Sequence, residues 1–171
     1  EKLVSITLGS GLREIKNNAF MNCSALSGIV IPNSVRVIGY EAFKDCVSLA
    51  EVTLGSGLEV IESYTFNNCQ SLKSITIPNN IKIINEYAFQ NCESLASIEF
   101  GNGLEKIGGG AFNSCSSLVG LYIPEEVTEI GARAFKGCKS GVLQNIWFED
   151  TDGWIVEDED GSQDPDLTNS T

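Results

Sequence analysis

The stretch LKSITIPNNIKIINEYAFQNC, residues 72–92, is one copy of a motif that returns along the chain every 23 residues. A fixed period of this length indicates one small structural unit stacked on copies of itself. The strictly repeated positions are apolar, so they predict packing between units rather than catalysis. Six phenylalanines and six cysteines keep the step, and we expect them to form core ladders: Phe20, Phe43, Phe66, Phe89, Phe112, Phe135, Cys23, Cys46, Cys69, Cys92, Cys115 and Cys138.

Three short elements are expected within each copy. Ile75 and Ile77 alternate with polar residues, which is typical of a strand whose apolar side chains point inward. Residues 81–84 predict a second short strand on the opposite side of the coil. Residues 86–92 are too few for a standard α-helix and predict a single helical or 3₁₀ turn. Because one coil cannot bury its own apolar side chains, we expect a stacked array of about seven coils over residues 1–148.

The corner after the first strand has two alternating forms. Residues 9–11, 55–57 and 101–103 are rich in glycine, whereas the intervening coils place Pro32, Pro78 and Pro124 at the same corner. Glycine permits positive φ, while proline fixes φ and removes a hydrogen-bond donor. The array therefore has a second period of 46 residues, and duplication of a two-coil unit is its simplest origin.

The composition argues against an enzyme. The chain has no histidine, so the commonest general base and metal ligand is missing. It also lacks a phosphate-binding loop and a nucleophile placed with a base. We expect no catalytic residue, no cofactor and no resident metal.

The charge is concentrated at the C-terminal end. The net charge is −12, and residues 149–171 hold nine acidic residues but no lysine or arginine. We expect this segment to form an acidic cap followed by a disordered tail. A calcium loop is the alternative, but the candidates around Gly153 and Gly161 each lack an acidic residue at one end. Nothing in the sequence forms the basic surface of a nucleic-acid binder.

No apolar run approaches the roughly 18 residues of a membrane span, and no signal peptide is visible. Leu3 and Ile6 already match Leu26 and Ile29, so the chain opens inside a repeat. We interpret it as part of a longer protein whose export signal and N-terminal cap lie upstream. We expect a monomer. Because the first coil has no cap, it can also form end-to-end contacts with another copy of the chain.

The motif resembles the BspA-like, or treponemal-type, leucine-rich repeats, whose pattern is L-x-x-I-x-I-P-x-x-V-x-x-I-x-x-x-A-F-x-x-C. The resemblance covers residues 3–148. It implies a leucine-rich repeat solenoid, of the strand-rich α/β class, in a bacterial cell-surface or secreted protein. It further implies adhesion, with a protein partner (host extracellular matrix among them) or a glycan. The alternative is a structural spacer, or stalk, with no ligand of its own.

The cysteines have no C-x-x-C spacing, so no zinc or redox motif is present. Stacked side chains point in parallel, whereas a disulfide needs a dihedral angle near 90°. We therefore expect a ladder of buried free thiols that pack as small apolar groups. Three disulfides between adjacent coils are the alternative.

Candidate contact residues lie on the outward side of the first strands, the face that solenoids commonly use for binding. Most outward positions there are small and neutral. Tyr122 and Trp147 fall on adjacent coils and should touch, and exposed aromatics are typical interface anchors. We take these two with Glu99 and Glu51 as the candidate contact set. The alternative for Trp147 is burial under the C-terminal cap.

The second strands carry alternating charges at equivalent positions of successive coils. This pattern predicts cross-strand ion pairs on a solvated structural face. The residues are Arg36, Glu59, Lys82 and Glu105.

Overall fold

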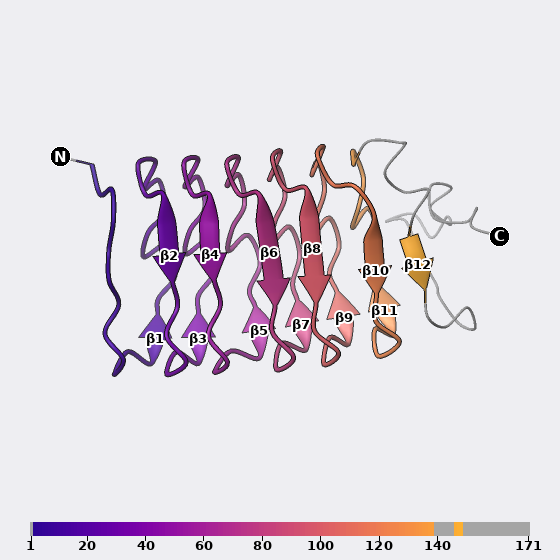
Figure 1. Cartoon of the computed structure of the whole chain (residues 1–171), viewed down its shortest axis with the longest axis horizontal. Coiled ribbons are helices and arrows are strands. Elements are labelled where there is room, and N and C mark those ends of the chain that lie inside the picture. The colour runs from indigo at the N-terminus through magenta and orange to yellow at the C-terminus, as the bar shows by residue number, and fades with distance from the viewer. Residues whose placement is uncertain (1, 139–145, 149–171) are drawn as a thin grey trace.

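The computed structural model describes residues 2–138 and the backbone of residues 146–148. The chain winds as a solenoid whose coils stand side by side along one axis (Figure 1). The longer strands form one row: β2 (Gly28–Val30), β4 (Glu51–Thr53), β6 (Ser74–Ile77), β8 (Ser97–Phe100), β10 (Leu121–Ile123) and β12 (Ile146–Phe148). The two-residue strands form a second row: β1 (Glu14–Ile15), β3 (Val37–Ile38), β5 (Val60–Ile61), β7 (Ile83–Ile84), β9 (Lys106–Ile107) and β11 (Glu129–Ile130).

The array is shorter than the sequence predicted. The described residues form about five turns with a spacing of about 23 residues, so the expectation of about seven coils was too high. Residues 3–8 carry the strand pattern, yet they form no strand. They have a neighbouring coil on one side only, and Leu3 and Val4 remain 38% and 59% exposed.

The predicted helical or 3₁₀ turn was wrong, because the described residues contain no helix. Alternate amides in this segment point along the solenoid axis instead: Phe43 N–H donates to the Thr65 carbonyl of the next coil at 2.9 Å. The residues between them close tight turns, as when Lys44 N–H donates to the Glu41 carbonyl at 3.2 Å. Glu41 adopts a φ of 54°, which a helix does not allow. The segment is therefore a third hydrogen-bonded ladder, which we call the turn side.

The 46-residue period appears in the pairing of the long strands. Parallel ladders join β2 to β4, β6 to β8 and β10 to β12, but no ladder joins β4 to β6 or β8 to β10. The ladders β2–β4 and β6–β8 each link a coil with a proline corner to the next coil with a glycine corner. In the short-strand row, β1 pairs with β3, and β5, β7, β9 and β11 form one sheet.

The corner glycines act through close approach rather than through positive φ. A side chain on Gly55 would lie 2.5 Å from the Pro32 carbonyl oxygen, and one on Gly101 would lie 2.6 Å from the Asn79 amide nitrogen. Neither glycine has a positive φ, since the described glycines in that region are Gly110, Gly120 and Gly137. The glycine corner thus fits directly against the proline corner of the preceding coil.

The core is one continuous column of repeated side chains. The phenylalanine rings stack from Phe20 to Phe135, and the Phe89–Phe112 pair has centroids 5.2 Å apart and an interplanar angle of 3°. Four of these rings, Phe43 to Phe112, are fully buried. Thr65 replaces the usual alanine and stays buried because its Oγ1 donates to the Glu62 carbonyl at 2.7 Å.

Candidate functional site

The outward side chains of the long strands form a surface that we call the long-strand face. Strand alternation places Ile75 and Ile77 in the core and leaves Ser74 and Thr76 in solvent. Thr76 Oγ1 donates to Glu99 Oε2 at 3.1 Å, so the hydroxyl group of one coil orients the carboxylate of the next coil. Most of the face carries small side chains, as the sequence predicted.

The C-terminal end of this face carries the candidate aromatic residues. Tyr122 of β10 is 50% exposed and is paired in register with Trp147 of β12. The side chain of Trp147, and the cap expected to cover it, lie outside the described residues. Val119 is 70% exposed just before β10. Glu99 occupies the position equivalent to Tyr122 one coil earlier. We call Glu99, Val119 and Tyr122 the C-terminal patch.

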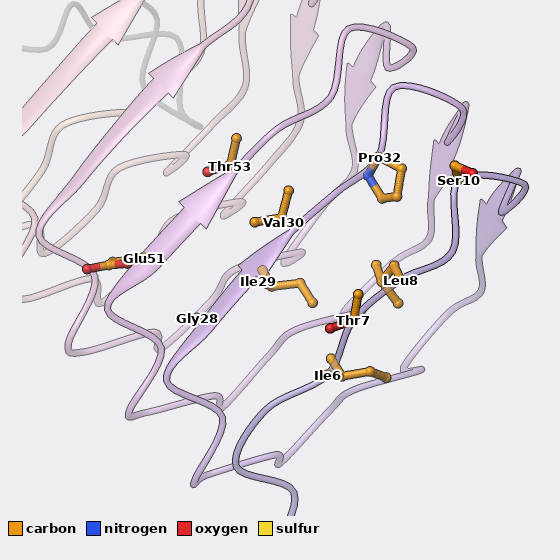
Figure 2. A pocket seen from close by; sticks show the side chains of 10 residues that line it. All are labelled: Ile6, Thr7, Leu8, Ser10, Gly28, Ile29, Val30, Pro32, Glu51 and Thr53. Carbon is orange, nitrogen blue, oxygen red and sulfur yellow. The ribbon is translucent and has the colours of Figure 1, made fainter.

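Glu51, the fourth predicted contact residue, lies at the other end of the same face. It lines a hollow of about 440 Å³ between the first coil and β2. Figure 2 shows Ile6, Thr7 and Leu8 of the first coil beside Ile29 of β2. The hollow is completed by Ser10, Gly28, Val30, Pro32 and Thr53. The structure therefore brings Glu99 near Tyr122 but separates Glu51 from both.

This hollow can offer van der Waals contact and a polar rim. Val30 is 64% exposed in its lining, and a side chain on Gly28 would lie in ordinary contact with Glu51, 3.6 Å from its carbonyl oxygen. Thr7, Ser10 and Thr53 supply hydroxyl groups around it. Such a surface can make reversible contact with a ligand.

The six cysteines are free thiols in the core ladder. Each thiol from Cys46 onward donates to a phenylalanine carbonyl of the preceding coil, as Cys92 Sγ does to Phe66 at 3.3 Å. Desolvation raises the pKa of Cys46 to about 12 and that of Cys138 to about 11. Burial likewise holds the pKa of Cys92 well above its usual range. The raised pKa keeps the thiols from Cys46 to Cys138 protonated at neutral pH, which makes them poor nucleophiles.

The predicted ion pairs of the second strands form in part. Lys82 Nζ lies 3.4 Å from Glu105 Oε1, as expected. Arg36 instead donates to the Asn33 carbonyl at 2.7 Å. No ladder joins β3 to β5, and a hollow of about 330 Å³ lined by Arg36 and Glu59 opens there. An unpredicted pair, Lys106 to Glu129, has the shorter separation of 2.6 Å.

One group of aromatic residues escaped the sequence analysis. On the turn side, the ring of Tyr64 contacts those of both Tyr40 and Tyr87, with centroid distances of 5.6 and 5.1 Å. Tyr64 and Tyr87 are 23 residues apart, and each lies two residues before a core phenylalanine. This spacing predicts that the two tyrosines occupy equivalent positions on adjacent coils. Tyr40 falls one residue earlier in its coil, which hid the group from a search for strict periodicity.

Two features are absent from the part of the chain that the structure describes. Within it, no three acidic, cysteine or histidine side chains are grouped so as to hold a metal ion. No helix within it has the length and apolar character needed to cross a bilayer. The acidic cap and the calcium loops considered for residues 149–171 lie outside the described residues.

Comparison with known proteins places the repeat in a family. Solved structures that resemble the chain include a leucine-rich repeat protein of T. pallidum, with 30% identity and a TM-score of 0.80 over 85% of this chain and 67% of that one. A leucine-rich repeat protein of Bacteroides ovatus has 31% identity and a TM-score of 0.74, covering 87% of this chain and 44% of that one.

A leucine-rich cell surface protein of Faecalibacterium prausnitzii has 25% identity and a TM-score of 0.57 over 85% of this chain and 54% of that one. No curated protein sequence matches the chain significantly. The profile of the BspA type leucine-rich repeat region matches residues 13–142 in six copies. The chain therefore belongs to the BspA-type leucine-rich repeat family.

Proposed function

We propose that this protein is a non-enzymatic binding module, exposed on a bacterial cell surface or secreted, that presents its long-strand face to a protein or glycan partner. The chain is related to bacterial leucine-rich repeat proteins, one of which is a cell surface protein. Its repeated apolar residues pack in the core, and the thiols from Cys46 to Cys138 are buried there with a raised pKa. Extracellular matrix proteins and mucosal glycans are the partners that the family relationship favours.

The observation that carries the proposal is the C-terminal patch. Tyr122 is an aromatic side chain that is 50% exposed, and Val119, three residues earlier, is 70% exposed, so this end of a mostly small and polar face carries apolar contact area. Glu99 stands beside it with its carboxylate held by Thr76, so a polar contact is pre-oriented. A spacer needs neither feature, and this favours binding over the alternative of a plain stalk.

The test is a binding assay with immobilised extracellular matrix proteins and with a glycan array. Tyr122→Ala should weaken binding about tenfold, because central aromatic contacts often contribute about 1–2 kcal/mol or more. Trp147→Ala should weaken it further if the cap leaves that side chain accessible. Tyr40→Ala is the matched control, since Tyr40 is 43% exposed but lies on the turn side.

The outcomes separate the two functions. No binding by the unaltered protein to any matrix protein or glycan would favour the spacer. Equal losses for Tyr122→Ala and Tyr40→Ala would remove the C-terminal patch from the proposal. We also propose that the protein is a monomer. Sedimentation at increasing concentration would reveal end-to-end contacts through the first coil.

A further inference from the structure

The tyrosine stripe, defined as Tyr40, Tyr64 and Tyr87, runs across three successive coils on the turn side. Its rings touch in sequence, edge to face and then stacked. The ring of Tyr87 also lies over Gly110 of the next coil, where a side chain would clash with it. The stripe is therefore a continuous aromatic ridge that ends at a bare glycine.

The local backbone does not favour tyrosine at these positions. Tyr64 and Tyr87 have φ values of 58° and 56°, in the left-handed region that bulky residues rarely adopt. Asn18 occupies the same position in the first coil with a φ of 59°, and asparagine tolerates this conformation well. Turn geometry alone thus gives no reason for two aromatic side chains here.

Two carboxylates lie next to the stripe with only neutral donors bound to them. Glu62 Oε2 accepts a hydrogen bond from Asn85 Nδ2, and Glu86 Oε2 accepts one from Ser63 Oγ, each at 2.9 Å. Both bonds bridge the same two coils that the Tyr64–Tyr87 stack bridges. Among the ion pairs of the described residues, none involves Glu62 or Glu86.

One step earlier along the stripe, the chain itself supplies a cation. Lys44 Nζ lies 2.5 Å from Glu41 Oε1 and 5.5 Å from the centroid of the Tyr64 ring. The positions equivalent to Lys44 in the next two coils are Asn67 and Gln90, which bond to each other at 2.9 Å and carry no charge. The pairing of tyrosines with carboxylates thus continues for two coils beyond Lys44, where the equivalent positions are uncharged.

We propose that Tyr64, Tyr87, Glu62 and Glu86 form a docking surface for lysine or arginine side chains of a basic protein segment. The carboxylates would pair with the cationic heads, and the tyrosine rings would contact the cations as the Tyr64 ring contacts Lys44 Nζ. The net charge of −12 further attracts a basic partner to the protein. This surface uses none of the residues of the long-strand face, so it is independent of the function proposed above.

The experiment measures binding of a fluorescein-labelled peptide of alternating lysine and glycine by anisotropy. A peptide with glutamine in place of lysine is the neutral control. The unaltered protein should bind the lysine peptide only, and binding should fall in ~0.5 M NaCl because exposed charges are then screened. Glu62→Gln with Glu86→Gln keeps both hydrogen bonds and removes both charges, and should weaken binding about five- to tenfold.

The tyrosines are tested separately from the charges. Tyr87→Asn fits the left-handed backbone and removes the ring, so it should weaken binding about threefold. Tyr87→Phe keeps the ring and should bind within about twofold of the unaltered protein. Circular dichroism melting of each variant establishes that the solenoid is intact before binding is compared.

A charge-matched control lies on the other face. Glu51→Gln with Glu99→Gln removes the same charge from the long-strand face and should leave peptide binding unchanged. An equal loss in that variant would reduce the effect to net charge and overturn the proposal. Equal binding of the glutamine peptide, or no binding of the lysine peptide, would also overturn it. None of these results bears on the binding of matrix proteins or glycans at the C-terminal patch.

Discussion

The first coil and the interior coils have the same motif but different environments. Phe43 and Cys46 are fully buried, whereas Phe20 and Cys23, their equivalents in the first coil, are only partly buried. Phe20 stacks on one ring, at 5.1 Å, while Phe43 has a ring on each side. Whether a core side chain is buried therefore depends on the coils on either side of it and not on its own coil alone, as expected for a repeat array.

Truncating one core ring at each place should give the largest difference. Phe89→Ala removes a fully buried ring between two others and should lower the free energy of unfolding by about 3–5 kcal/mol. Phe20→Ala removes a partly buried ring with one neighbour and should cost less than about 2 kcal/mol. Urea unfolding of both variants measures the difference.

Equal losses at Phe20 and Phe89 would contradict the comparison, because they would mean that the first coil is as well packed as the interior. A change in the urea m-value of Phe89→Ala would point to separate unfolding of the two halves of the array. Long repeat arrays unfold in parts when one interface is weakened.

The interior thiols provide the second test, through pH. The pKa of Cys46 rises from 9.0 to about 12 in the folded protein. Between these values the unfolded chain releases a proton that the folded chain keeps. The free energy of unfolding is therefore fully retained below pH 9 and falls as pH rises toward 12, by up to about 1.4 kcal/mol per pH unit for each such thiol.

Chemical denaturation at several pH values checks this slope. Cys92→Ala with Cys115→Ala removes two buried thiols whose pKa is raised by desolvation, so the slope should become shallower. If the unfolding free energy of that variant fell with pH as steeply as that of the unaltered protein, the loss of stability at alkaline pH would not come from the thiol ladder. The variant itself starts from a lower stability, because each substitution leaves a small cavity.

The smallest effect is expected on the second strands. Lys106→Gln breaks an exposed ion pair with Glu129 between interior coils and should cost about 0.2–1 kcal/mol. Glu14→Gln changes the equivalent position of the first coil, where Glu14 faces Val37 across the ladder, and should be neutral. Thermal melting at low and high salt separates them, since only the Lys106 effect should shrink with salt.

Periodicity made the stacked core predictable, because every Phe and Cys of the ladder keeps its step of 23 residues. It failed for the turn side. The sequence pattern of this short segment is compatible both with a helical turn and with a hydrogen-bonded ladder. Which of the two forms depends on hydrogen bonds to a neighbouring coil, and these cannot be read from one repeat. Asp45, with a φ of 61°, shows the signal that was available: asparagine, aspartate, serine or glycine stands at this position in every coil.

The candidate site was predictable only in part for a related reason. Alternation places Tyr122 outward, and the parallel register then sets it beside Trp147, so this pair followed from the repeat. Glu51 belongs to the neighbouring outward row and lies at the other end of the array, so it shares a face with Glu99 and Tyr122 without lying near them. Tyr40 joins Tyr64 through a side-chain contact between non-equivalent positions, and no periodic reading could have supplied that.

The uneven distribution of ladders has a mechanical consequence. On the turn side every junction from the first coil onward is closed by main-chain bonds, from Asn18 to Tyr40 through to Ser114 to Lys136. The two strand rows each lack a ladder at some junctions. Under tension the turn side should resist extension, while the interrupted rows open first. The array should therefore bend before it stretches, and a partner pulling on its end would meet a compliant rod rather than a rigid one.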